Sequence, residues 1–399
     1  MPSSPTLGDV IRAFGATLRE RRAGAVTPAQ TAVLGTLERC HTAALGGHVY
    51  QCDSCGSEQT AFNSCGNRHC PSCLAHKSAQ WLQARHKELL PVPYFHVVFT
   101  LPEQISALAL GNKKVVLSIL FRAAAATLLT LAADPKHLGA NIGFLAILHT
   151  WTQTLLFHPH IHCVVPGGGL SSDGTRWVAS RRHFFLPVRV LSRLFRGKFL
   201  DLLGAARDKS QLHFAGVTAG LSDDPGWRTF VRQMRAKEWV VYAKSPFGSP
   251  EQVLKYLARY THRVAISNSR ILGIEGDQVR FRYRDRTDGT KTRVMSLGGV
   301  EFLRRFLLHV LPAGFVRIRY FGFLAPRCRT ALLTQCRSLL VNSTLAAAIL
   351  PQPPAKPDSA ANSHDLCPVC RTGHLRLVAT LLPTRQLLTS QAVPPRDTS

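Results

Sequence analysis

Two histidines separated by a single residue are the first candidates for chemistry in this sequence. They are His160 and His162, in the run FHPHIHCVV. On a β-strand alternate residues share one face, so both imidazoles would point the same way, with Ile161 and Cys163 on the other side. Two imidazoles held side by side can chelate a metal ion. A pair of hydrogen-bonded core histidines would give the same pattern, so both interpretations stay open at this point.

Two tyrosines on one expected helix are the second candidates. Ser249 is a suitable N-cap for a helix that continues as VLKYLARYTHRV, in which Tyr256 and Tyr260 share one face. A phenol can attack a phosphodiester when a cation polarises the phosphate, and the phosphotyrosine ester that forms conserves the bond energy without ATP. Val253 and Leu257 extend the tyrosines into the apolar stripe of an ordinary core-facing helix, which is the alternative.

The charge of the chain predicts a polyanionic partner. The 399 residues include 49 Lys and Arg against 23 Asp and Glu, a net charge of +26, and nucleic acid fits this excess better than a membrane surface. In the run VRFRYR at 279–284, strand alternation would put three arginines on one face, suited to a phosphate backbone unless that face is merely solvated. The residues expected to bind nucleic acid are Lys255, Arg259, Arg263, Arg280, Arg282 and Arg284.

The clustering of the cysteines predicts zinc rather than disulfides. The chain has 11 cysteines, an odd number, and several of them form CxxC pairs. Each CxxC turn can aim two thiolates at one cation, and two such turns complete a tetrahedral zinc site. The sequence therefore predicts one zinc ion bound by Cys52, Cys55, Cys70 and Cys73.

Other cysteines leave further zinc sites open. Cys40, Cys65 and His69 lie near the two pairs in the sequence and could hold a second zinc ion or be ordinary core residues. A third CxxC pair, Cys367 and Cys370, lies in the tail with histidines on both sides. It is half of a zinc ribbon, and a third zinc site there is an open alternative.

The scaffold for these candidates is expected to be an α+β fold with a largely antiparallel sheet. The runs YFHVVFTL and IHCVV are typical of strands, and Asp-Gly pairs at 173–174 and 288–289 indicate hairpins. The apolar stretch 115–133 is long enough to span a membrane, but Arg122 lies inside it, which favours a buried helix. We expect no membrane association, and without a secretory signal we expect a cytoplasmic protein.

Composition divides the chain into three consecutive segments. Residues 1–90 are expected to form a small zinc-binding, DNA-recognising domain, and residues 91–325 the domain that carries the histidines and tyrosines. Residues 326–399 are expected to form an irregular, Pro-rich tail.

Five motifs occur in one order: NRHCPSC, PYFHVVFTLP, HPHIHCVVPGGGL, YLARYTHRVAISNSRI and EFLRRFLLHVLPAGFVRIRYFGFLAPRCR. In this order they resemble the two-tyrosine HUH rolling-circle transposases of the insertion-sequence-ninety-one type, from about Cys40 to Arg329. The resemblance implies an HUH nuclease domain: a central antiparallel sheet flanked by helices, with the histidine pair on one strand and the tyrosine helix beside it. It also implies that a zinc-binding domain precedes the nuclease domain.

The resemblance also implies a reaction. His160 and His162 would hold Mg²⁺ or Mn²⁺. Tyr256 and Tyr260 would cut single-stranded DNA at element ends, keeping the 5′ phosphate on a tyrosine, freeing a 3′ hydroxyl and transferring strands. A third protein ligand is expected, and the sequence does not identify it. His262 is preferred because it follows the tyrosine helix, and the other candidates are Gln252, His158 and His149.

Two other functions compete with a transposase. A zinc-containing protein that binds nucleic acid without catalysis would keep the histidines and tyrosines as core residues. A plasmid replication initiator or relaxase would use the same chemistry in another setting. The zinc module and the order of the motifs favour the transposase over the initiator.

Overall fold

The computed structural model describes residues 5–22, 24–181, 185–244, 252–253, 264–285, 289, 291–341 and 366–384. It has the expected α+β fold with antiparallel sheets. The chain forms two compact units, each built from stretches distant in sequence, whereas composition had suggested three consecutive segments. Unit 1 comprises Met1–His76, Ile266–Arg304 and Gln352–Ser399, and unit 2 comprises Lys77–Ala265 and Arg305–Pro351.

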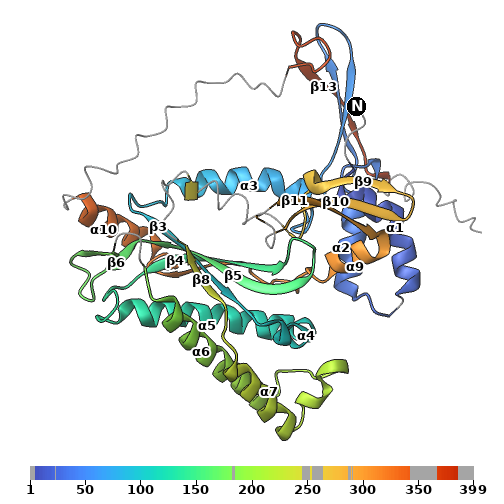
Figure 1. The fold of residues 1–399 in the computed structure, drawn as a ribbon. Coiled ribbons are helices and arrows are strands. Elements are labelled where there is room, and N and C mark those ends of the chain that lie inside the picture. Colours follow the sequence, from blue (N-terminus) through green and yellow to red (C-terminus); the bar gives the residue numbers. More distant parts are fainter. Residues whose placement is uncertain are drawn as a thin grey trace, which may run out of the picture. The chain divides into compact units, whose positions relative to one another are not determined.

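Unit 2 is organised around a five-stranded antiparallel sheet (Figure 1). Its strand order is β12 (Ile318–Gly322), β4 (Gly143–Trp151), β5 (Phe157–Pro166), β3 (Tyr94–Thr100) and β8 (Val241–Lys244). The histidine run forms β5, which lies between β4 and β3 and hydrogen-bonds to both. A central strand has partners on both sides, so its backbone is held in place and its side chains are fixed in direction.

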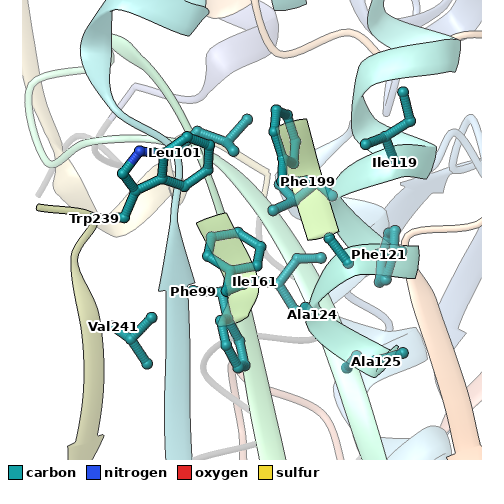
Figure 2. Packing of buried hydrophobic residues seen from close by; sticks show 14 of the residues in the cluster. Phe99, Leu101, Ile119, Phe121, Ala124, Ala125, Ile161, Phe199, Trp239 and Val241 are labelled. Carbon is teal, nitrogen blue, oxygen red and sulfur yellow. The ribbon is translucent and has the colours of Figure 1, made fainter. Parts of the chain in front are cut away.

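One face of this sheet packs against the helices α5 (Lys113–Ala133) and α6 (Val188–Asp208). Figure 2 shows Phe99 and Ile161 from the sheet gathered with Ala124 of α5 and Phe199 of α6. Among the described residues, α5 is the helix long and apolar enough to cross a membrane, and 67% of its apolar window is buried inside the protein. Its place under the sheet accounts for its apolar sequence.

Smaller elements complete unit 2. The opposite face of the sheet is covered in part by α10 (Arg329–Val341), through Leu333 and Cys336. Other described elements of unit 2 are α4 (Ser106–Gly111), β6 (Gly168–Leu170), β7 (Trp177–Ala179) and α7 (Asp224–Ala236), with short 3-10 helices at Glu103–Ile105 and Gly216–Leu221. Helix α3 (Pro71–His86) begins in unit 1 and continues into unit 2.

Unit 1 combines two capped helices with two small sheets. Helices α1 (Leu7–Arg21) and α2 (Pro28–Glu38) both begin with a capping box, at Thr6 and at Thr27. One sheet has the order β13 (Leu375–Leu381), β1 (Gly47–Cys52) and β2 (Glu58–Phe62). The other has the order β11 (Lys291–Gly298), β10 (Gln278–Asp285) and β9 (Ile271–Glu275), followed by α9 (Gly299–Leu307). Strand β13 comes from the tail that was expected to be irregular.

Candidate metal centres and nucleic-acid interface

Three histidines meet on one face of the sheet in unit 2. His160 and His162 of β5 lie beside His149 of β4, which is directly opposite His160 in the strand register. One ring nitrogen from each lies within 4.8 Å of the others. Ile161 and Cys163 point into the core on the other face, as strand alternation predicts. The arrangement is therefore a preformed set of three nitrogen donors on two hydrogen-bonded strands.

Hydrogen bonds fix the direction of two of these rings. The Nδ1 atom of His160 lies 2.7 Å from the carbonyl oxygen of His158, so this nitrogen carries the proton and donates it. The Nδ1 atom of His162 lies 2.8 Å from Nε2 of His96, and the two rings stack with an interplanar angle of 3°. With Nδ1 engaged in both rings, Nε2 is the atom that each would present to a cation.

The third ring is held by packing. His149 is 3% exposed, and the indole of Trp151 stacks on it with ring centroids 4.4 Å apart. Behind Trp151 lies His309, whose Nδ1 is 3.1 Å from the Thr150 hydroxyl and whose Nε2 is 3.1 Å from the carbonyl oxygen of Leu155. Burial lowers the pKa of His309 to about 3, so this imidazole stays neutral and holds the turn between β4 and β5.

The sequence left four candidates for the third metal ligand, and the structure describes three of them. His149 belongs to the cluster, whereas the ring of His158 lies beside His160 at a centroid distance of 5.7 Å and is not part of it. Gln252 is exposed. His262, the preferred candidate from the sequence, lies outside the described residues. His96 was missed as a partner of His162, although it stands in the strand-like run YFHVVFTL.

The tyrosine pair lies outside the described residues, as do Lys255, Arg259 and Arg263. Two residues at the start of the expected helix, Gln252 and Val253, are described and helical. Val253 is 1% exposed and belongs to the same buried cluster as Ile147 and Val164. Ile147 lies two residues before His149 on β4, and Val164 lies two residues after His162 on β5, so both share the histidine face of the sheet. Val253 therefore packs on that face.

The cysteines of unit 1 form two clusters rather than the single site expected from the sequence. Cys70 and Cys73 lie with Cys40 and Cys65, all four sulfur atoms are within 4.8 Å of one another, and three of the pairs are 3.5–3.6 Å apart. A tetrahedral ion with metal–sulfur bonds of about 2.3 Å would place its ligands about 3.8 Å apart. His69, suggested as a member of a second site, instead hydrogen-bonds to Asn67 and is not among the four.

The second cluster joins the first CxxC pair to the tail. Cys52 lies 3.7 Å from Cys370, and Cys55 lies 3.7 Å from Cys367, measured between sulfur atoms. This grouping differs from the one predicted from the sequence for a simple reason. Cys52 and Cys55 stand at the turn between β1 and β2, while Cys40 precedes this hairpin and Cys65 follows it. The length of the hairpin therefore separates the two CxxC pairs that the sequence had grouped together.

The thiols of the first cluster resist ionising together. A hydrogen bond from Cys65 lowers the pKa of Cys70 to about 5, whereas burial raises the pKa of Cys40 to about 12. One thiolate is therefore stabilised at neutral pH and further ones are opposed by burial and by its charge. A divalent cation would reverse that balance, because a coordinated thiol is deprotonated.

The three arginines of β10 lie on one exposed face, as alternation predicts. Arg280, Arg282 and Arg284 are exposed, while Val279 and Phe281 between them are buried. Arg280 forms an ion pair with Glu275, with a nitrogen–oxygen distance of 2.6 Å. The face is suited to a phosphate backbone, with part of its charge already neutralised.

Comparison with known proteins agrees with this combination of sites. Residues 143–331, which include the histidine cluster, match a family described as "Putative transposase", and residues 10–101, which include the first cysteine cluster, match "Transposase zinc-binding domain". These two matches identify a transposase with a zinc-binding domain. As a transposase, it is a DNA-processing enzyme that binds DNA.

Similarity to two known proteins shows the family to which the chain belongs. The chain is 52% identical over 377 residues, 94% of each chain, to "Putative transposase y4qJ" of Sinorhizobium fredii (strain NBRC 101917 / NGR234). It is 32% identical over 292 residues to "Transposase for insertion sequence element IS801" of Pseudomonas savastanoi pv. phaseolicola, covering 72% of this chain and 68% of the relative. The chain belongs to the IS91 family of transposases, which confirms the resemblance drawn from its motifs.

Proposed function

We propose that this transposase cuts and rejoins single-stranded DNA by tyrosine attack beside a metal ion held by His149, His160 and His162. The observation that carries the proposal is the meeting of these three side chains, from two adjacent strands, within 4.8 Å of one another. Buried histidines often pair for structural reasons alone. Three converging rings, two of them oriented through Nδ1, are the arrangement of a ligand set.

The donor set fits a divalent transition ion better than Mg²⁺. Imidazole nitrogen is a softer ligand than the carboxylate and water oxygens that Mg²⁺ prefers. We therefore expect Mn²⁺ to bind more tightly, while Mg²⁺ would need additional oxygen ligands such as water and the DNA phosphate. When bound, the ion would polarise the scissile phosphate and stabilise the charge that develops on its oxygens.

Tyr256 and Tyr260 supply the nucleophiles in this proposal. They follow Val253 at helical spacing, and Val253 packs with the strands that carry the histidines. The phenol of one tyrosine loses its proton as its oxygen forms a bond to phosphorus. The bond from phosphorus to the 3′ oxygen breaks, and that oxygen takes up a proton to become the free 3′ hydroxyl. The 5′ phosphate stays on the tyrosine. A second tyrosine permits a further cut before the first ester is resolved, as rolling-circle strand transfer requires.

The other regions bind and position the DNA in this account. Zinc in the cluster of Cys40, Cys65, Cys70 and Cys73 would hold unit 1 together, since its thiol spacing fits a tetrahedral ion. The arginine face of β10 would contact backbone phosphates. The protein would act at element ends in the bacterial cytoplasm.

Trapping the covalent intermediate tests the proposal. Single-stranded oligonucleotides from the DNA flanking the gene would be incubated with the protein and Mn²⁺, and protein–DNA adducts resolved on a denaturing gel. We expect an adduct that EDTA prevents and that the double variant Tyr256→Phe, Tyr260→Phe does not form. Tyr283→Phe on β10 is the matched control and should form it normally. Tight binding of the same oligonucleotides without any adduct would instead support a non-catalytic DNA-binding protein.

A further inference from the structure

We propose that Cys52, Cys55, Cys367 and Cys370 bind a second structural zinc ion, which fastens the C-terminal strand β13 to the N-terminal zinc-binding module. Two of these ligands lie within residues 10–101, the part of the chain that matches the zinc-binding family, and two lie far outside it. The ion would therefore join chain segments 312 and 318 residues apart. The inference does not depend on the nuclease chemistry proposed above.

The sulfur geometry fits one tetrahedral ion. Both measured sulfur–sulfur distances between the pairs are 3.7 Å, close to the value of about 3.8 Å expected around a single zinc. A disulfide would require about 2.05 Å. The spacing thus matches a single thiolate-coordinated ion, and thiolates select zinc among the common divalent metals.

The two CxxC turns have the same backbone conformation. In the first, the amide of Gly56 donates to the carbonyl of Cys52 at 3.1 Å, and in the second the amide of Arg371 donates to the carbonyl of Cys367 at 2.9 Å. Gly56 has a φ of 70° and Arg371 a φ of 60°. A left-handed conformation is unfavourable for arginine, so its presence in the tail matches a turn constrained by function.

Backbone amides also point at the sulfur atoms. The amides of Ser54 and Cys55 approach Cys52 Sγ at 3.4 and 3.5 Å, and the amide of Gly373 approaches Cys370 Sγ at 3.3 Å. Such contacts stabilise thiolate over thiol, since an amide dipole favours negative charge. In both half-sites, backbone amides are therefore placed where they can donate to a metal-bound thiolate.

The two half-sites approach each other closely, and a glycine makes this possible. A Cβ atom at Gly373 would lie 2.5 Å from Cys52 Sγ and 2.5 Å from Ser54 Cβ. Asp53 reinforces the approach by accepting from the amide of His374 at 2.8 Å and pairing with Arg376 at 3.2 Å. Any side chain at position 373 would force the half-sites apart.

Among the described residues, strand β13 makes few buried contacts. It pairs antiparallel with β1 from Cys52↔Leu375 to Gly47↔Leu381, but its five central residues are all exposed, including Leu377 and Val378. Strand β2, on the other side of β1, is also almost wholly exposed. A three-stranded sheet without a buried apolar face is marginal in water, so a metal ion is the natural source of its stability.

Metal content and exchange measurements on the full chain test the inference. We expect two zinc equivalents in the wild-type protein and one in Cys370→Ser. Cys328→Ser is the control because Cys328 belongs to neither cluster, and it should keep two. Hydrogen exchange at Leu375–Leu381 should be slow in wild type and control and fast in Cys370→Ser, while α1 and α2 remain protected.

Cys370→Ser could lose zinc simply because it lacks one ligand, so a second variant should keep all four thiols and disturb only their arrangement. Gly373→Ala should also retain one zinc equivalent, whereas Gly35→Ala, where an added Cβ meets nothing within 4 Å, should retain two. One equivalent of zinc in the wild-type chain would overturn the proposal. So would two equivalents in both Cys370→Ser and Gly373→Ala, or an equivalent of iron in place of the second zinc.

Discussion

The histidine cluster and the first cysteine cluster are both arranged to hold a cation, but they depend on their surroundings in opposite ways. The histidines stand on β4 and β5, inside a five-stranded sheet whose other face packs on α5 and α6. The cysteines Cys40, Cys65, Cys70 and Cys73 converge from a turn, loops and the start of α3. In the first case the fold alone positions the proposed metal ligands, and in the second a bound zinc ion would help to stabilise the fold.

The largest effect should come from removing a ligand of the first cysteine cluster. Cys73→Ala should unfold the zinc-binding part of unit 1, because structural zinc binding contributes on the order of 10 kcal/mol to the folding of small zinc modules. Zinc content and hydrogen exchange over α1 and α2 would measure this loss. Unit 2 should keep its protected sheet, and a variant with full zinc content would contradict this account.

Removing a proposed histidine ligand should strongly reduce activity without unfolding the protein. His162→Ala should lower the rate of adduct formation by at least about 10²–10³-fold, because metal stabilisation of the phosphate charge is worth several kcal/mol. Its thermal unfolding should stay close to that of the wild type. His149→Ala should behave the same way and His158→Ala should not, so equal losses in those two variants would contradict the assignment of the third ligand.

A smaller effect is expected at His96, which contacts a ligand rather than the ion. Loss of a hydrogen-bonding partner of a metal ligand typically weakens metal affinity by about 10–100-fold. His96→Ala should show such a change in Mn²⁺ affinity by titration calorimetry, and His96→Gln should recover part of it, because an amide oxygen can accept from Nδ1 of His162. His213→Ala, at an exposed position, serves as the control. Unchanged Mn²⁺ affinity in His96→Ala would show that the ring only packs there.

The smallest effects should appear on the arginine face of β10. For single-stranded DNA, each phosphate contact that is lost should reduce the slope of log affinity against log salt by about 0.7. Arg282→Gln should show this reduction, and Arg280→Gln should show less, because Glu275 already pairs with Arg280. Fluorescence anisotropy across a salt series would measure both slopes. Slopes that match the wild type would remove β10 from the DNA interface.

The features of these sites that depend on local sequence could be predicted, whereas those that depend on strand pairing could not. Strand alternation is local, so the shared face of His160 and His162 and the arginine face of β10 follow from the residues themselves. The partners His149 and His96 depend on which strands pair and in which register, and one sequence does not show this. His96 stands in the strand-like run YFHVVFTL and His149 was one of the candidates for the third ligand, but nothing in the sequence selects either of them.

For the cysteines, the sequence showed which residues could bind metal but not how they are grouped. CxxC spacing indicated turns that could bind metal, and each CxxC pair does lie in a group of four cysteines. Which pairs come together depends on the β1–β2 hairpin and on the return of the tail. Proximity in the sequence favoured Cys52 with Cys70, whereas the fold places Cys52 beside Cys370. Strand β13 was missed, and the tail was predicted to be irregular. The residues of β13 are exposed on both faces, so they do not show the alternation of apolar and polar residues that indicates a strand.

The central claim is that His149, His160 and His162 together hold the ion that the nuclease uses. Pulsed electron paramagnetic resonance of Mn²⁺ bound to the zinc-loaded protein would count the imidazole nitrogens coupled to the ion. We predict three coupled nitrogens in the wild-type protein and two in His149→Ala. Three couplings that persist in His149→Ala, or Mn²⁺ bound with no imidazole coupling, would contradict the account.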